Sequence, residues 1–323
     1  MNLIKKVLLR PTLDHILNYW GSNNAKNYDL KNTIAIACSG RGGSTWLTEI
    51  IGTLPGYPIL WEPLHLAKNP ECKNYGYNWN TYIPYHAEDN IKKNYLEQIL
   101  IGQNLSTNII SSLAFHPQKF FNFQGFLVKF VNANLLFNWM LKQFPIQGIL
   151  MIRHPCAVVE SQLRHSAWNH INKNNLTFPQ QLTVDYPHLV QIFETIQTRE
   201  EILAFEWAIQ TYIPLIQPKS KFLYIITYEK LINESKLEIN RLFNYLGKPV
   251  PKSAYEKLKQ VSKTTQQVSN VTHNKNVLTG WKERLLPQQI DNILNIVHQV
   301  GINFYNDSLI PDYKNLSDLV NQS

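Results

Sequence analysis

The feature that most constrains the fold is an apolar run that passes directly into a glycine-rich turn and then into a helical pattern. Residues 33–38 read TIAIAC, residues 39–43 read SGRGG, and residues 44–54 carry the apolar spacing of a helix. A run this short and this apolar is typical of a strand that is buried on both faces. The order of strand, loop and helix therefore predicts an α/β protein.

Four further apolar runs repeat this arrangement along the chain. They are residues 57–61, 126–131, 148–152 and 222–227. Helical patterns follow them at residues 133–144, 156–164, 200–216, 231–246 and 288–300. Doubly buried strands separated by helices pack as a parallel sheet with right-handed crossovers. We therefore expect a central parallel β-sheet flanked by helices, with two long connections at residues 63–95 and 165–190.

One domain accounts for the patterned part of the chain. The length of 323 residues is large for a single domain, but nucleotide-binding α/β domains reach it unbroken. We expect a helical extension at residues 1–32, one domain at residues 33–300 and a tail at residues 301–323. Residues 1–20 have two interpretations, a packing helix or an amphipathic helix on a membrane surface.

Composition excludes several classes of protein. Apolar residues make up 44% of the chain and charged residues 17%, without a low-complexity tract, which excludes collagens, coiled coils and mucin-like stalks. The 31 Lys and Arg residues outnumber the 23 Asp and Glu residues, and the formal charge of +8 favours anionic ligands. Because the basic residues are scattered, no nucleic-acid partner is expected.

The cysteines and the apolar runs bear on the location of the protein. Cys38, Cys72 and Cys156 are an odd number at unrelated spacings, which predicts neither a disulfide framework nor a zinc site. No stretch approaches the roughly 20 apolar residues that span a bilayer, and the first 20 residues do not resemble a signal peptide. We expect reduced thiols, a cytoplasmic location and no transmembrane segment, with peripheral membrane contact as an open alternative.

The glycine-rich loop has the features of an anion site. Glycines let the backbone wrap closely around an anion, and the first amides of the following helix point at it. The loop is not of the Walker A type, because Gly43 stands where that loop has lysine and the cation lies earlier, at Arg41. It is not a dinucleotide fingerprint either, because Thr45 replaces the third glycine. We predict a phosphate-binding loop.

A second phosphate-binding pattern follows the fourth apolar run. Residues 149–165 read ILMIRHPCAVVESQLRH, in which a strand ends at Arg153 and Pro155 starts a helix. Ser161 stands eight positions after Arg153. A guanidinium group at the strand tip and a hydroxyl group two turns along the helix can bind one phosphate. The alternative is that Arg153 is a surface residue beside the helix.

These two motifs resemble those of the sulfotransferases that use 3′-phosphoadenosine-5′-phosphosulfate (PAPS). The residues that match the family's 5′-phosphosulfate loop are Arg41, Gly42, Gly43, Ser44, Thr45 and Trp46. Gly42 stands where the family usually has serine. Arg153 and Ser161 match its 3′-phosphate motif. The resemblance covers about residues 33–285. It implies a fold like that of P-loop nucleotide kinases, PAPS as donor, 3′,5′-adenosine bisphosphate (PAP) as product and no required metal.

A glutamate after the second apolar run is the candidate base. Glu62, in the segment LWEPLH, lies at a strand tip where its carboxylate can take a proton from an acceptor hydroxyl. Carbohydrate and tyrosylprotein sulfotransferases have a comparable glutamate, whereas the small-molecule branch uses a histidine after a later strand. Here that strand keeps Lys129 and lacks the histidine, so the chain looks closer to the first branch. His65 is the alternative base, and pairing with Arg41 is the alternative role of Glu62.

Three other residues match the family. Lys129 is expected to stabilise negative charge near the sulfuryl group, with a surface role as the alternative. Tyr228 follows the last predicted strand, as does the family's tyrosine near the adenine. Lys275 matches the lysine of the family's Arg-Lys-Gly segment, in which Asn274 and Asn276 here replace the arginine and the glycine.

The expected activity is transfer of a sulfuryl group from PAPS to a hydroxyl group of a carbohydrate, a glycolipid or another hydroxylated metabolite. Aromatic residues in the first long connection either line a sugar or lipid acceptor site or pin the loop to the body of the protein. They are Tyr75, Tyr77, Trp79, Tyr82 and Tyr85. Two other function classes stay open: a P-loop kinase or phosphotransferase, and a non-catalytic binder of phosphonucleotides or polyanions.

Overall fold

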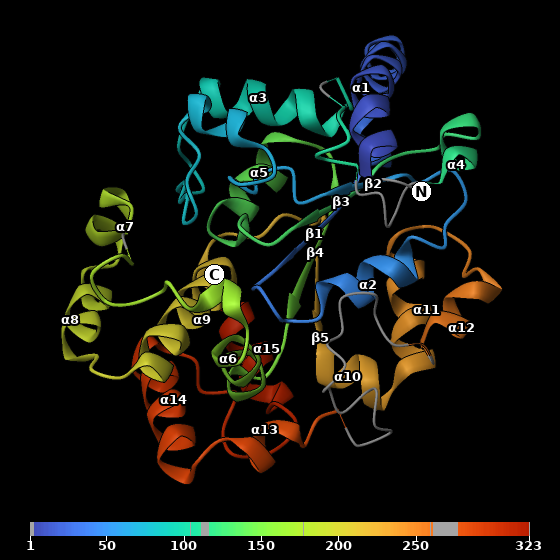
Figure 1. Ribbon diagram of the computed structural model, residues 1–323. Coiled ribbons are helices and arrows are strands. Elements are labelled where there is room, and N and C mark those ends of the chain that lie inside the picture. The colour runs from blue at the N-terminus through green and yellow to red at the C-terminus, as the bar shows by residue number, and fades with distance from the viewer. Residues whose placement is uncertain are drawn as a thin grey trace.

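The computed structural model describes residues 3–103, 105–110, 116–176, 178–258, 260 and 277–322, without the side chains of residues 3–10. Within these residues, five parallel strands form one sheet with the order β2-β3-β1-β4-β5 (Figure 1). They are β1 (Ile34–Cys38), β2 (Ile59–Trp61), β3 (Leu127–Phe130), β4 (Gln147–Ile152) and β5 (Leu223–Thr227). Each strand coincides with an apolar run of the sequence, so the predicted parallel sheet is confirmed.

Helices cover both faces of the sheet, because successive strand residues point to opposite sides. In β1, Ile34 and Ile36 belong to the smaller of two hydrophobic cores and Ala35 to the larger one. The helices of the smaller core are α2 (Ser44–Ile51), α10 (Tyr228–Asn233), α11 (Ser235–Tyr245) and α12 (Lys252–Leu258). The helices that pack into the larger core are α1 (Leu3–Ala25), α3 (Asn90–Leu100), α4 (Pro117–Phe121), α5 (Phe137–Gln143), α6 (Pro155–Leu163), α7 (Gln180–Asp185), α8 (Pro187–Thr195), α9 (Arg199–Ile216), α13 (Gly280–Arg284), α14 (Pro287–Val300) and α15 (Tyr313–Asn321).

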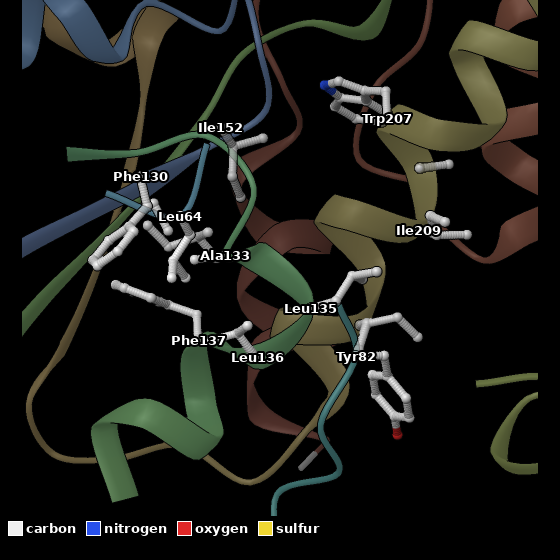
Figure 2. Close-up of a cluster of buried hydrophobic side chains, with 14 of the residues drawn as sticks. Leu64, Tyr82, Phe130, Ala133, Leu135, Leu136, Phe137, Ile152, Trp207 and Ile209 are labelled. Atoms are coloured by element: carbon white, nitrogen blue, oxygen red, sulfur yellow. The ribbon is translucent and has the colours of Figure 1, made fainter. Parts of the chain in front are cut away.

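Part of the larger core joins the sheet to α9 and to the two long connections. Figure 2 shows Phe130 of β3 and Trp207 of α9 on either side of the segment that follows β3. Tyr82, from the connection after β2, packs beside Leu135 with its hydroxyl group turned away from the cluster. That hydroxyl donates a hydrogen bond of 2.6 Å to Oδ2 of Asp185 in α7. The two long connections are therefore tied to one another.

The helix predicted over residues 231–246 is instead two helices. Thr227 caps α10, so this helix begins three residues earlier than predicted, and Glu234 then interrupts it with φ −118° and ψ 36°. The Ser235 hydroxyl donates to the carbonyl of Ile232 over 2.9 Å, which is the kind of local hydrogen bond by which serine competes with helix backbone. The break separates α10 from α11.

Short helices appear where the sequence predicts connections. The 3₁₀ turns are η1 (Leu30–Asn32), η2 (Pro70–Tyr75), η3 (Asn134–Leu136) and η4 (Ser166–Trp168). With α7 and the start of α8, η2 and η4 occupy parts of the two long connections, and η3 replaces the first turn of the helix predicted over residues 133–144. Prolines begin η2 and α8, where a missing amide proton costs nothing. Elements this short carry no periodic apolar pattern, which is why the prediction missed them.

Both ends of the described chain pack against the central part. Trp20 of α1 meets the rings of Phe120 and Phe123 edge-on, each with 5.0 Å between ring centroids. Ile302 and Tyr305, which follow α14, are fully buried in the larger core. Among the described residues, no helix combines the length and the apolar character needed to cross a membrane.

Candidate functional site

The strand order brings the predicted motifs to one edge of the sheet. Cys38 at the end of β1 pairs with Met151 of β4, and Trp61 at the end of β2 pairs with Lys129 of β3. Because β1 lies between β3 and β4, the connections leave it in opposite directions, and ligands of such sheets bind at this crossing. A cavity of about 850 Å³ lies there, lined by the loop after β1, the ends of β2, β3 and β4, and parts of α6 and α9.

The glycine-rich loop turns sharply before α2. Arg41 has φ 74° and Gly43 has φ 98°, both in the left-handed region, and the Gly42 amide donates to the Ser39 carbonyl over 2.9 Å. A Cβ atom on Gly43 would lie 2.7 Å from a ring carbon of Tyr228, so no side chain fits there. Gly43 caps α2, whose first amides therefore face the cavity beside Ser44, as a phosphate-binding loop requires.

Two arginines from neighbouring strand tips form the basic part of the cavity. Arg41 Nε donates to the Ser161 hydroxyl over 3.0 Å, and Arg153 Nη1 donates to the Arg41 carbonyl over 3.2 Å. Ser161 is thus brought to Arg41, the loop cation, rather than to Arg153. Burial and the nearby Arg153 and Arg164 lower the pKa of Arg41. Among the described residues, neither Arg41 nor Arg153 is hydrogen-bonded to a carboxylate, and Arg153 Nε is buried without a partner.

Two aromatic rings lie beside this arginine pair. The Arg153 guanidinium lies over the ring of Tyr228, 4.3 Å from its centroid. The rings of Tyr228 and Trp46 are 5.7 Å apart, and Trp46 Nε1 donates to the Lys257 carbonyl over 3.3 Å. Both rings line the cavity and can pack against a flat base. Lys275 lies outside the described residues.

Glu62 is held between two lysines. Its carboxylate accepts from Lys129 Nζ over 2.5 Å and also from Lys68 Nζ. Burial alone would raise the pKa of Glu62, but the two ion pairs outweigh it and leave that pKa below its usual range. The backbone of Glu62 has φ 52°, and its amide donates to the Lys129 carbonyl over 2.8 Å, which turns the side chain into the cavity. Glu62 therefore pairs with these lysines and not with Arg41.

Lys129 is an interior residue rather than a surface lysine. Only 2% of it is exposed, and its ammonium group lies 4.6 Å from the ring centroid of Trp61. Burial lowers the pKa of Lys129, against the opposing attraction of Glu62. A buried cation beside the phosphate-binding loop can stabilise an anion bound in the cavity.

His65 lies on the same cavity wall, next to Trp79. Its Nδ1 accepts the amide proton of Ala67 over 3.3 Å, and its ring meets that of Trp79 edge-on at 4.8 Å. Burial and the nearby Lys68 lower the pKa of His65, which favours the neutral form of the ring. A neutral ring whose Nδ1 accepts a hydrogen bond carries its proton on Nε2.

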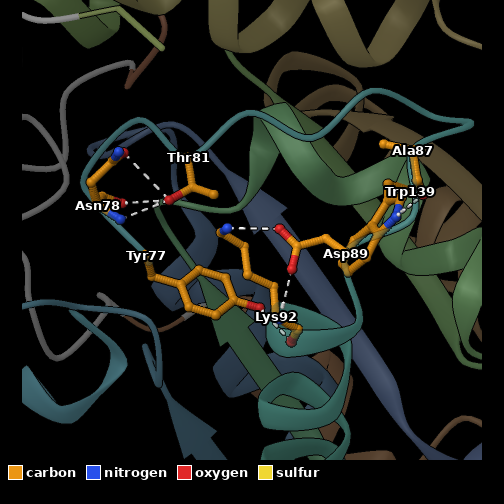
Figure 3. A network of polar contacts seen from close by, with 7 residues as sticks. All are labelled: Tyr77, Asn78, Thr81, Ala87, Asp89, Lys92 and Trp139. Atoms are coloured by element: carbon orange, nitrogen blue, oxygen red, sulfur yellow. Dashed lines mark hydrogen bonds and ion pairs between the residues drawn. The ribbon is translucent and has the colours of Figure 1, made fainter. Parts of the chain in front are cut away.

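The aromatic residues of the first connection divide between the packing of the loop and the wall of the cavity. The Tyr77 hydroxyl donates to the Lys92 carbonyl over 2.9 Å (Figure 3). The side chain of Lys92 in turn donates from its Nζ to the Asp89 carboxylate. The ring of Tyr75 stacks on that of Tyr95 in α3, and Tyr82 packs into the larger core. Trp79, in contrast, is 46% exposed and lines the cavity with its neighbours Asn78 and Asn80. Most of these rings pin the loop, and Trp79 faces the site.

Sequence reasoning missed four charged groups of the cavity wall besides Lys68. Glu160 of α6 accepts from Arg164, one turn further along the helix, and from Arg284 Nε of α13 over 2.5 Å. The spacing of Glu160 and Arg164 was a usable signal, because residues four apart meet on a helix surface. Arg284 lies 124 positions away from Glu160, and nothing local indicates their contact. The fourth group, Glu206 of α9, also faces the cavity.

Comparison with known proteins agrees with this arrangement. Residues 31–303 match the family model for the sulfotransferase domain. No curated protein matches the chain.

Solved structures similar to the chain include other sulfotransferases. The sulfotransferase domain from the curacin biosynthetic pathway is 16% identical, with 83% of this chain and 96% of that chain covered and a TM-score of 0.43. The sulfotransferase domain of the Synechococcus PCC 7002 olefin synthase is 16% identical, with 87% and 98% covered and a TM-score of 0.43. Mouse sulfotransferase SULT7A1 complexed with PAP is 14% identical, with 92% of each chain covered and a TM-score of 0.41. Since the family model spans most of the chain and all of the strand-tip groups described above, this chain belongs to the sulfotransferase family of enzymes.

Proposed function

We propose that the protein transfers a sulfuryl group from PAPS to a hydroxyl group of an acceptor. The observation that carries the proposal is the pair of cavity-lining arginines, Arg41 and Arg153, at the tips of adjacent strands. Neither is hydrogen-bonded to a carboxylate among the described residues. Unpaired guanidinium groups in a partly buried site require an anion. A donor with a phosphosulfate at one end and a phosphate at the other supplies two.

The residues present fit such a donor. The 5′-phosphosulfate would be held by Arg41, Ser44 and Thr45 together with the amides at the start of α2. The backbone can approach the donor closely there, because Gly43 has no side chain and no room for one. Arg153, whose Nε lacks a partner, would hold the 3′-phosphate, and Ser161, which is hydrogen-bonded to Arg41 beside it, would contribute its hydroxyl group to the same phosphate. Trp46, Gly42 and Tyr228 would enclose the nucleotide, and Lys275 stays a prediction for the same phosphate.

Glu62 is the proposed base that removes the proton from the acceptor hydroxyl. In the free protein its basicity is held down by Lys129 and Lys68. A bound polyanion attracts both ammonium groups, which weakens their hold on the carboxylate and raises its proton affinity. The base would thus become effective when the donor is in place, and Lys129 would then stabilise charge near the sulfuryl group.

His65 fits the role of base less well. The lone pair of its Nδ1 is used by the Ala67 amide, and its Nε2 then carries the proton. Such a ring can donate a hydrogen bond to an acceptor but has no free lone pair with which to take a proton.

The acceptor proposed here is a carbohydrate, a glycolipid or another hydroxylated metabolite. The exposed ring of Trp79, with Asn78 and Asn80 beside it, supports this class, since sugars bind to aromatic faces and amide groups together. A cytoplasmic location and peripheral membrane contact stay predictions.

PAP should raise the melting temperature of the protein more than ATP or adenosine 5′-phosphate does at equal concentration. Only PAP carries phosphates at both the 3′ and the 5′ positions, so only PAP engages both arginines, and a ligand stabilises in proportion to its affinity for the folded state. Thermal denaturation with each nucleotide measures this. Equal shifts for all three would contradict the proposed donor, and a larger magnesium-dependent shift with ATP would favour a kinase.

Replacing Arg153 with alanine should weaken PAP binding by about 1.5–3 kcal/mol, the usual size of a hydrogen bond to a charged group. Arg241→Ala is the control, because Arg241 is half-exposed on α11, pairs with Glu234 and the buried Glu238, and does not line the cavity. Isothermal calorimetry gives both dissociation constants. An unchanged value for Arg153→Ala would remove this residue from the donor site.

A further inference from the structure

The α9 wall of the cavity carries a carboxyl group that nothing in the described chain satisfies. Glu206 forms no hydrogen bond or ion pair there, and its Oε2 is buried. Burial raises its pKa to about 7, and no charged neighbour opposes this rise. Trp207 and Gln210 of the same helix and Ala157 of α6 line the cavity beside it. Glu206 therefore lies apart from the ion pairs of Glu62 and Glu160.

An unpaired donor lies on the segment that packs against this part of α9. Asn132 follows β3, lines the cavity and has a buried Nδ2 without a hydrogen-bond partner. Two residues later, Asn134 Nδ2 donates to the Gln210 carbonyl over 3.0 Å. This bond ties the segment to the helical turn that starts at Glu206, and Figure 2 shows the continuation of the segment next to α9.

Two unsatisfied polar groups that line the same cavity indicate a ligand. Buried polar groups in folded proteins nearly always have hydrogen-bond partners, and leaving one unpaired is costly. The group that fits both residues is a hydroxyl, which accepts a hydrogen bond from the Asn132 amide group and donates one to the Glu206 carboxyl group. An ammonium group can donate to Glu206 but cannot accept from Asn132.

Resting on the proposed function, we propose that Glu206 and Asn132 bind a second hydroxyl group of the acceptor, one that is not sulfated. The acceptor class is then a molecule with at least two hydroxyl groups. Its reacting hydroxyl lies at Glu62, and its second hydroxyl lies at the α9 wall. The protein should discriminate against alcohols of the same shape that have a single hydroxyl.

Cyclohexanol and the isomeric cyclohexanediols test this inference with PAPS as donor and mass spectrometry of the sulfated product. For the wild-type protein, kcat/KM of the best diol should exceed that of cyclohexanol by about tenfold or more. This ratio is taken after division by two, because a diol offers two hydroxyl groups that can be sulfated. Glu206→Met, which keeps the size and removes the polar atoms, should lose this preference. Asn132→Leu should reduce it, and Glu194→Met, an exposed position on α8, should retain it.

The outcomes separate the inference from the proposed function. If PAP fails to stabilise the protein and no alcohol is sulfated, the proposed function fails. If alcohols are sulfated but Glu206→Met keeps the wild-type preference, or the wild type has none, only the inference fails. If PAP binds but none of these alcohols is sulfated, the test is calorimetric binding of the diol and of cyclohexanol to the PAP-saturated protein. Equal affinities for the two would overturn the inference. Glu206→Met should bind PAP as the wild type does.

Discussion

Glu62→Gln should slow sulfuryl transfer by about 10²–10⁴-fold in a single turnover at saturating PAPS, the usual contribution of a general base. The amide keeps the size of the side chain and cannot take the proton. Binding of PAP should persist or tighten, because the variant removes a negative charge and leaves Lys129 and Lys68 free to attract the anion. Rate and affinity should therefore move apart.

The measurement pairs rapid-quench transfer with calorimetric titration of PAP for wild type and variant. Glu71→Gln, an exposed glutamate on η2, serves as the matched control and should resemble the wild type in both. A parallel loss of rate, PAP affinity and stability would make Glu62 a structural partner of the lysines. Near-wild-type turnover would refute the assignment of Glu62 as the base.

Glu206→Met should stabilise the protein at pH 8 and have a much smaller effect at pH 5. Burial raises the pKa of Glu206 from an ordinary 4.5 to about 7, so the folded state holds this proton more tightly than the unfolded state does. Between these pH values the folded chain carries more protons, and the free energy of unfolding falls as the pH rises. The cost is absent well below pH 4.5 and complete above about pH 7. The expected gain at pH 8 exceeds that at pH 5 by about 2–3 kcal/mol.

Urea denaturation of the wild type, Glu206→Met and Glu194→Met at pH 5 and pH 8 measures this difference. Glu194→Met, at an exposed position on α8, is the control for the substitution itself. A gain that is the same at both pH values would show that Glu206 is not held as a destabilised acid. A loss of stability at pH 8 would show that it has a partner.

Local sequence patterns were sufficient for the sheet and for the loop. Five apolar runs predict five parallel strands, because a strand that is buried on both faces is apolar throughout. Such a strand can be recognised without knowing which strands lie beside it. The helix after the loop is likewise predicted from residues 44–54, although α2 ends at Ile51. What local patterns did not predict are the break at Glu234 and the turn η3, where single side-chain hydrogen bonds decide the backbone.

The candidate site divides in the same way. Arg41, Glu62 and Arg153 were predictable because each follows a strand, and parallel strands bring their ends to one edge. Lys68 and Glu206 were not, because each belongs to a segment whose orientation depends on distant packing. Glu206 in particular lies in an ordinary helical pattern, and only the tertiary structure shows that its carboxyl group faces a cavity.

The cavity has walls of two different origins, which matters for engineering. The cationic part is built on the segments that follow the strand ends, so the backbone of the sheet fixes the position of its side chains. The opposite part is built on one helix, where Glu206 and Gln210 lie one turn apart and both face the cavity. If Glu206 binds the acceptor as proposed, substitutions at these two positions of α9 should change the choice of acceptor while the donor half keeps its geometry.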